Sequence, residues 1–153
     1  MTEIKKKESL FNSRFETSLR VLLLLAEATV WPLSASTISN IDFMATYGKE
    51  FGVSDYDLHG QNSYKFSQLP AKKQLVDEAI KKLVRLGFVS VDLSNGYRYM
   101  ITDSGVSFID EMDDTYSEQY RAVVGSIFKK YDVSDPSVLD DALKAARAKK
   151  TEE

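Results

Sequence analysis

The stretch from Leu69 to Ile109 constrains the fold of this chain more than any other. An amphipathic segment begins at Leu69-Pro70 and ends at Gly87, a residue suited to the left-handed position that follows a helix. Residues 88–93 and 97–101 then read as two short strands rich in β-branched and aromatic residues. A helix that leads directly into a two-stranded hairpin predicts the C-terminal half of a winged-helix domain.

The turn between these strands sets their register. A three-residue loop, Ser94-Asn95-Gly96, places Gly96 in the left-handed position. The pairs expected from this loop are Leu93 with Tyr97, Val91 with Tyr99, and Val89 with Ile101. We prefer this loop to a two-residue Asn95-Gly96 turn because it puts all the large apolar side chains on one face.

Capping signals predict the other helices. Ser13, followed by Glu16 three residues later, is a capping-box pattern for a helix to about Ala28, and Ser34 can cap a second helix to about Tyr47. Further helices are expected from a Thr102 cap, over 115–131, and after a Ser137 cap. The apolar face of the first helix consists of Phe15, Leu19, Leu22, Leu23 and Ala26, with Val21, Leu24 and Leu25 widening it. That width predicts a helix central to the core.

These elements predict a mainly α fold with a small β-hairpin, made of a winged-helix-like core plus a C-terminal helical extension. The expected divisions are a flexible N-terminal arm (1–9), a winged-helix-like domain (10–112) and the helical extension (113–153). The apolar run in the first helix is interrupted by charges and is too short to cross a bilayer, so it is expected to be buried. The polar N-terminus and the absence of cysteine predict a cytoplasmic protein.

Charge is unevenly distributed along the chain. The net charge of −3 argues mildly against autonomous DNA binding, yet residues 70–87 hold five basic against two acidic residues. Residues 103–119 hold six acidic residues and no basic one. This polarity suits a protein with two different partner faces. The residues that could contact DNA phosphates are Lys72, Lys73, Lys81, Lys82, Arg85 and, on the hairpin, Arg98. A merely solvated lysine face is the alternative.

No motif in the sequence predicts catalysis. Phosphate-binding glycine loops and a Gly-x-Ser-x-Gly elbow are absent, so no cofactor and no enzymatic activity are expected. The loop 48–68 contains three alternating polar residues, Asp55, Asp57 and the only histidine, His59, which could hold a cation if the loop were extended. No second histidine is present to complete a zinc site, so no metal is predicted. That loop is either a surface loop packed by its aromatic residues or a partner-binding loop.

A series of short segments, in order along residues 10–131, resembles the middle component of bacterial ABC-three-component systems. The segments are Leu10-Phe11-Asn12-Ser13, Phe15-Glu16, Leu19-Arg20-Val21-Leu22, Ile41-Asp42-Phe43, Phe51-Gly52, Leu58-His59, Tyr64-Lys65, Lys72-Lys73-Gln74-Leu75-Val76, Gly87-Phe88-Val89 and Tyr97-Arg98-Tyr99. The chain departs from the family pattern where Tyr47 replaces a histidine, Lys65 an arginine, and Lys72-Lys73 an arginine pair. Lysine keeps the positive charge but loses the bidentate geometry of arginine.

The resemblance implies a non-catalytic subunit that acts with an SMC- or Rad50-like ATPase and a nuclease-type effector, as in Lamassu-type anti-phage or anti-plasmid defence. Such a subunit would hold the effector in check until phage or aberrant DNA is sensed. The expected partner-interface residues are Asp42, Tyr47, His59, Tyr64, Lys65, Tyr116, Tyr120 and Phe128. The alternative function is a winged-helix transcription regulator, dimeric through its C-terminal helix; a hydrolase or metalloenzyme using His59 is a third.

Overall fold

The computed structural model describes residues 13–29, 31–60 and 64–152. The predicted N-terminal arm, residues 1–9, lies outside this range. The helices are α2 (Arg14–Glu27), α3 (Ala35–Thr46), the short 3₁₀ helix η1 (Lys65–Gln68), α4 (Leu69–Arg85), α5 (Asp103–Asp110), α6 (Thr115–Lys130) and α7 (Pro136–Glu152). The strands are β1 (Val89–Asp92) and β2 (Arg98–Ile101). The predicted fold class, mainly α with a small β-hairpin, is confirmed.

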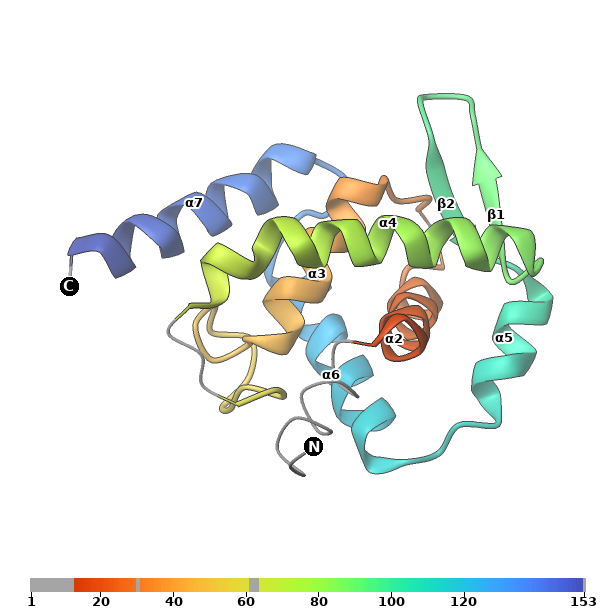
Figure 1. The fold of residues 1–153 in the computed structure, drawn as a ribbon, viewed down its shortest axis with the longest axis horizontal. Coiled ribbons are helices and arrows are strands. Elements are labelled where there is room, and N and C mark those ends of the chain that lie inside the picture. Colours follow the sequence, from red (N-terminus) through yellow and green to blue (C-terminus); the bar gives the residue numbers. More distant parts are fainter. Residues whose placement is uncertain (1–12, 30, 61–63, 153) are drawn as a thin grey trace.

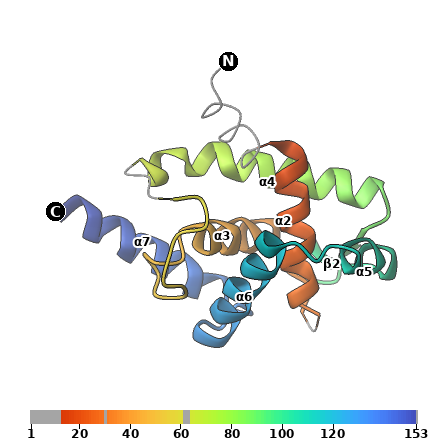
Figure 2. The same ribbon diagram turned by 90° about the horizontal axis from the view of Figure 1, so that it is seen from below.

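Helix α3 lies at the centre of the molecule. It packs against α2, α4, α6 and α7, and Figure 2 shows it between α4 on one side and α6 and α7 on the other. Every residue from Thr37 to Thr46 is buried, the polar ones included. From Thr37 to its last residue the helix is therefore enclosed on all sides by the rest of the protein.

Helix α2 is central, as predicted, with eight buried residues, and it packs on α4, α6 and α3. The expectation for Phe15 was wrong, because its side chain is 61% exposed. Phe15 stands in the first turn of the helix, before the buried residues of α2 begin at Thr17. None of the described helices combines the length and the apolar composition needed to cross a membrane.

The helix starts follow the predicted capping residues in three cases. Ser13, Ser34 and Thr102 each accept a hydrogen bond from the backbone N–H three residues later, at 3.1, 3.2 and 3.1 Å. The prediction for Ser137 was wrong. Helix α7 begins at Pro136, and Asp135 accepts hydrogen bonds from both the N–H and the hydroxyl of Ser137, at 3.0 and 2.8 Å. The carboxylate of Asp135 therefore satisfies the free N–H group at this helix end.

The hairpin has the predicted register. Val89 pairs with Ile101 and Val91 with Tyr99, and Gly96 has a φ of 78° in the turn. The segment between α2 and α3 also joins the hairpin, because Leu33 and Tyr99 exchange two backbone hydrogen bonds of 3.0 and 2.8 Å. Figure 1 shows the hairpin rising beside the C-terminal end of α4. The long loop after α3 is partly buried through Phe51 and Val53 and ends in η1, which runs directly into α4.

Candidate functional site: a buried polar network

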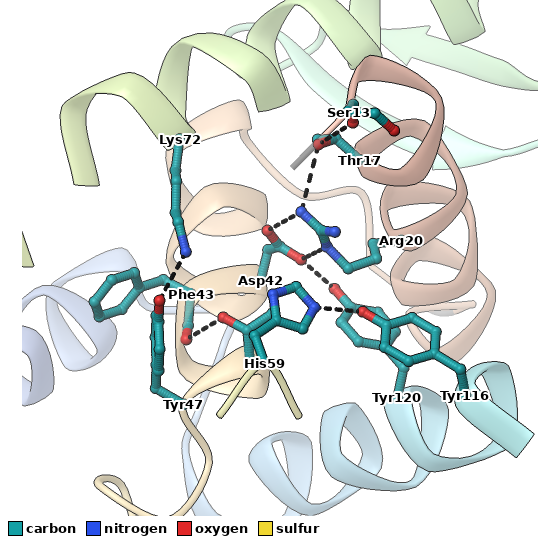
Figure 3. Close-up of polar contacts among 11 residues, drawn as sticks. Ser13, Thr17, Arg20, Asp42, Phe43, Tyr47, His59, Lys72, Tyr116 and Tyr120 are labelled. Carbon is teal, nitrogen blue, oxygen red and sulfur yellow. Dashed lines mark hydrogen bonds and ion pairs between the residues drawn. The ribbon is translucent and has the colours of Figure 1, made fainter. Parts of the chain in front are cut away.

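A buried ion pair joins the two central helices. Arg20 of α2 donates from Nε to Oδ1 of Asp42 on α3 at 2.9 Å, and the two residues are each 3% exposed (Figure 3). The second guanidinium nitrogen lies 3.5 Å from Oδ2 of Asp42 and 3.4 Å from the Thr17 hydroxyl. Because charged groups lose their hydration when they are buried, such a pair is tolerated only when its polar atoms are well satisfied.

Tyr120 of α6 completes the pair from the third helix. Its hydroxyl, which is fully buried, donates to Oδ1 of Asp42 at 2.7 Å. Burial alone would raise the pKa of Asp42, but the charge and hydrogen bond of Arg20, together with the Tyr120 hydroxyl, outweigh it and lower that pKa. Burial and the negative charge of Asp42 raise the pKa of Tyr120. Asp42 is therefore the ionised acceptor that connects α2, α3 and α6.

His59 closes the network from the loop. Its Nε2 lies 2.7 Å from the Tyr116 hydroxyl, and the two rings stack with their centroids 6.0 Å apart (Figure 3). Burial, followed by the positive charges of Arg20 and Lys72, lowers the pKa of His59 to about 3, although Asp42 acts in the opposite direction. The imidazole is therefore neutral at neutral pH. The one histidine of the chain fastens the loop to α6.

A second polar cluster surrounds Tyr47 at the end of α3. Lys72 donates to the Tyr47 hydroxyl at 3.0 Å, and its ammonium lies 4.6 Å from the centroid of that ring. Lys65, which is 5% exposed, forms an ion pair with Glu50 at 3.0 Å and lies 5.5 Å from the Tyr47 ring. These contacts hold η1 and the start of α4 against the loop that follows α3.

The two clusters contain residue types that occur in active sites, but their exposure is low. Arg20, Asp42 and Tyr120 are enclosed by three helices, so no described surface gives a substrate access to them. Each polar group in the Arg20–Asp42–Tyr120 network is used by another residue of the same chain. The arrangement is suited to fixing the relative positions of α2, α3, α6 and the loop.

The predicted partner-interface residues fall into two groups. Asp42, Tyr47, Lys65 and Tyr120 are buried and contact their own chain, so a partner could reach them only after a rearrangement. Tyr116, Phe128 and His59 are half-buried, whereas Tyr64 is 74% exposed. The role of all eight as interface residues stays a prediction, and Tyr64 is the one that a partner can contact most directly.

The predicted phosphate-contacting residues also divide. Lys81, Lys82 and Arg85 are exposed on the C-terminal half of α4, beside the hairpin (Figure 1). Lys73 is half-buried, and Lys72 is held by Tyr47. Arg98 donates from Nε to the backbone carbonyl of Asn95 at 3.3 Å. Any contact of this face with DNA stays a prediction.

The alternating polar residues of the loop do not converge. Asp57 accepts a hydrogen bond from the N–H of Lys49, at 3.1 Å, His59 is directed at Tyr116, and Asp55 is exposed. Within the described ranges no group of three side chains is placed to hold a metal ion. The loop is not extended, because it turns at Gly52 and Gly60, which have φ values of 68° and 77°.

Sequence reasoning did not select Arg20, Thr17 or Glu50. Arg20 is one of the charges that interrupt the apolar run of α2, and its position between Leu19 and Val21 is the sequence signal for a buried cation. The matching acid, Asp42, lies in an equally apolar context between Ile41 and Phe43. Two opposite charges, each within an apolar helix face, predict a buried pair.

Comparison with known proteins places this architecture in context. A family model described as ABC-three component (ABC-3C) system Middle Component 2 matches residues 10–153. The match therefore includes every described helix and strand, from α2 to α7. No curated protein and no solved structure matches the chain.

Proposed function

The chain belongs to the Middle Component 2 family of ABC-three component systems, and from this membership we propose that it is a non-catalytic adaptor subunit. The family is a middle component of a multi-subunit system, which implies protein partners. The match over residues 10–153 is the observation that carries the proposal. The burial of the Arg20–Asp42–Tyr120 network supports it, because those groups stabilise the subunit and are not open to a substrate.

The proposed partners are an SMC- or Rad50-like ATPase and a nuclease-type effector, as in Lamassu-type defence against phages or plasmids, in the cytoplasm. The subunit would hold the effector inactive until foreign or aberrant DNA is sensed. Its surface offers two faces of opposite charge for this purpose. The exposed Lys81, Lys82 and Arg85 lie on α4, whereas the exposed Asp110, Glu111 and Asp113 lie at the end of α5 and after it.

The hairpin is the best candidate for a direct protein contact. Val91, Leu93 and Tyr97 are 38%, 66% and 70% exposed, so the hairpin presents apolar side chains to solvent beyond its own pairing. Exposed aromatic and aliphatic residues that stand together often contribute to protein interfaces. We assign this tip to a contact with one of the other components.

We also propose that residues from α2 to β2 form a winged-helix-like unit. The order of elements supports this: a helix, an extended segment at Leu33, two helices and a hairpin, with Leu33 paired to Tyr99 as a third strand would be. In this arrangement α4 corresponds to the helix that faces DNA in many such domains. DNA contact within the complex would then use Lys81, Lys82 and Arg85.

The alternative, a transcription regulator that dimerises through the helix at residues 116–131, has less support. Tyr120, Val124 and Ile127 form the apolar stripe of that helix, and all three are buried within the same chain. Little apolar surface of this helix therefore remains exposed for contact with a second copy of the chain. A regulator would also be expected to bind a specific DNA sequence on its own, with an affinity that falls steeply as salt rises.

Co-expression with the products of the adjacent genes tests the proposal. We expect a stable complex, and we expect the paired substitution Leu93→Ser and Tyr97→Ser to reduce recovery of a partner at least about fivefold. Phe15→Ser is the matched control, because Phe15 is 61% exposed in the first turn of α2 and is not one of the predicted interface residues. Sequence-selective DNA binding by the purified chain, with no complex formed, would support the regulator instead.

A further inference from the structure

A pocket of about 270 Å³ lies where the C-terminal ends of α2 and α6 meet. Its walls include three aromatic side chains, Trp31, Phe128 and Tyr131, and two carboxylates, Glu27 and Asp132. The aromatic residues come from the segment after α2, from the last turn of α6 and from the residue after α6. None of these five residues takes part in the Arg20–Asp42–Tyr120 network.

The aromatic lining has an open side. Trp31 is the only tryptophan of the chain and is 56% exposed, which is unusual for so large an apolar surface. Phe128 is half-buried and lines the same pocket. The faces of aromatic rings carry partial negative charge and attract cations, and tryptophan does so most strongly.

The two carboxylates retain unused acceptor capacity. Oε1 of Glu27 accepts from Nε of Arg121 at 2.6 Å, and Oδ1 of Asp132 accepts from the Ser134 N–H at 3.1 Å and from the Ser134 hydroxyl. No partner for Oε2 of Glu27 or Oδ2 of Asp132 occurs among the residues that the structure describes. Each carboxylate can therefore accept one more donor from a group in the pocket.

Two cations of the chain lie close by but are occupied. Arg121 is paired with Glu27, and Lys130 donates to the Phe51 carbonyl at 2.6 Å while lying 5.4 Å from the centroid of the Tyr131 ring. The ring of Tyr131 therefore already interacts with the Lys130 ammonium, and Tyr131 serves mainly as part of the pocket lining. Attraction for an incoming group comes from Trp31, Phe128 and the two free carboxylate oxygens.

We propose that this pocket binds an arginine side chain of a partner polypeptide. A guanidinium group can stack on Trp31 while it donates to a carboxylate, and its planar shape suits both contacts. A lysine ammonium can make the same contacts one at a time, so it is the weaker ligand. The inference rests on the proposed function, because it supplies the chemistry by which a protein partner is held.

Trp31 provides a direct measurement, since all tryptophan fluorescence of the chain comes from it. The isolated full chain is titrated with N-acetyl-arginine amide, N-acetyl-lysine amide and N-acetyl-citrulline amide. Citrulline has nearly the shape of arginine but no charge. We expect a saturable change with the arginine compound at about millimolar concentration and at least about fivefold weaker binding of the citrulline compound.

Asp132→Asn is the sharpest variant, because asparagine keeps an oxygen that can accept from Ser134 while it removes the negative charge. It should weaken binding of the arginine compound about three- to tenfold. Phe128→Leu, which keeps an apolar side chain but removes the ring, should weaken it to a similar extent. Asp55→Asn, an exposed acid in the loop, is the matched control and should leave binding unchanged.

Equal affinity for the arginine and citrulline compounds overturns the proposal, as does the absence of a saturable change. An equal loss with Asp55→Asn also overturns it, because the effect would then be one of total charge. Circular dichroism and a melting curve show whether Asp132→Asn and Phe128→Leu are folded. If the arginine compound does not bind but the co-expressed complex forms, only the pocket proposal is refuted. If the compound binds but no complex forms with the co-expressed proteins, only the adaptor role is refuted.

Discussion

Arg20 and Asp42 are separated by 22 positions in the sequence, yet their side chains meet in the core with 2.9 Å between Nε and Oδ1. Both are almost completely buried, so neither charge is stabilised by water. The hydrogen bond from Tyr120 adds α6 to the contact. The ion pair and the Tyr120 hydrogen bond therefore fix the relative orientation of three helices. Burying the two charges removes their hydration, which opposes folding.

Removing one partner of this pair should be strongly destabilising. Asp42→Ala leaves the Arg20 guanidinium buried without its counter-charge, and we expect the free energy of unfolding to fall by about 3–5 kcal/mol. Urea unfolding followed by circular dichroism measures this. The double variant Arg20→Met and Asp42→Leu should lose less than Asp42→Ala, because no unpaired charge remains. A loss below about 1 kcal/mol for Asp42→Ala would contradict the importance of the pair.

The stability of the fold should fall on mild acidification because of His59. Its pKa is lowered to about 3 in the folded state, whereas in the unfolded chain it is about 6.5. The unfolded state therefore binds the proton first, so the contribution of the neutral imidazole is complete above pH 6.5 and is lost as the pH falls toward 3. Between pH 8 and pH 5 the free energy of unfolding should decrease by about 2 kcal/mol from this group.

Two measurements separate His59 from the other titrating groups. Because the chain has one histidine, its ring protons can be followed by NMR without assignment ambiguity, and they should not titrate between pH 8 and pH 5. The His59→Gln variant should show a smaller loss of stability over the same range. Asp42 adds a dependence at lower pH, since its lowered pKa means that its contribution is present above about pH 4 and disappears below it. A histidine that titrates near pH 6.5 would refute the buried, neutral state.

Two glycines in helices should respond in opposite ways to alanine. A Cβ at Gly105 would lie 2.4 Å from the Phe88 carbonyl oxygen and 2.7 Å from Ile101 Cγ1, so α5 would have to move away from the hairpin. We expect Gly105→Ala to lower the free energy of unfolding by about 2 kcal/mol or more. At Gly125 in α6 no atom of the described residues, apart from its chain neighbours and the adjacent helix backbone, lies within 4 Å of such a Cβ. Gly125→Ala should therefore raise the free energy of unfolding by about 0.5–1 kcal/mol. Parallel thermal melts of the two variants test the contrast, which fails if both shift in the same direction.

Thr102 combines two hydrogen bonds at the junction between the hairpin and α5. Its hydroxyl donates to the Gly87 carbonyl at 2.7 Å and accepts from the Gly105 N–H at 3.1 Å. Thr102→Ala should therefore cost about 1–2 kcal/mol, in the upper part of the range for a lost helix cap. Thr102→Ser keeps the hydroxyl and should recover most of that loss in the same unfolding assay. If both variants are equally destabilised, the hydroxyl is not the cause.

Local sequence signals predicted the elements well. The caps at Ser13, Ser34 and Thr102, the left-handed Gly87 and Gly96, and the hairpin register all depend on interactions within a few residues, and all are confirmed. The enclosure of α3 was not predictable in this way. The enclosure depends on the packing of α4, α6 and α7 around α3. The polar residues of α3 are typical of an exposed helix face, so the sequence did not indicate that they are buried.

The candidate site was predicted only in part. Asp42, Tyr47, His59, Lys65, Lys72, Tyr116 and Tyr120 were selected as interface residues or phosphate contacts, and the structure brings them into two neighbouring clusters within the chain. Their pairing with Arg20, Thr17 and Glu50 could not be deduced, because it joins helices and a loop whose packing is set by the whole core. The family resemblance, the aromatic spacing and the basic helix face indicated these residues, and the structure shows with which neighbours they interact.

The pair of backbone hydrogen bonds between Leu33 and Tyr99 has a mechanical consequence. Trp31 lies only two positions before Leu33. The proposed arginine-binding pocket, which Trp31 lines, is therefore connected to the hairpin through one short backbone segment. If the hairpin moves away from the helices, either both Leu33–Tyr99 hydrogen bonds break or the segment that carries Trp31 moves with the hairpin. The Leu33–Tyr99 hydrogen bonds therefore join the backbone of the hairpin to the segment that carries the tryptophan.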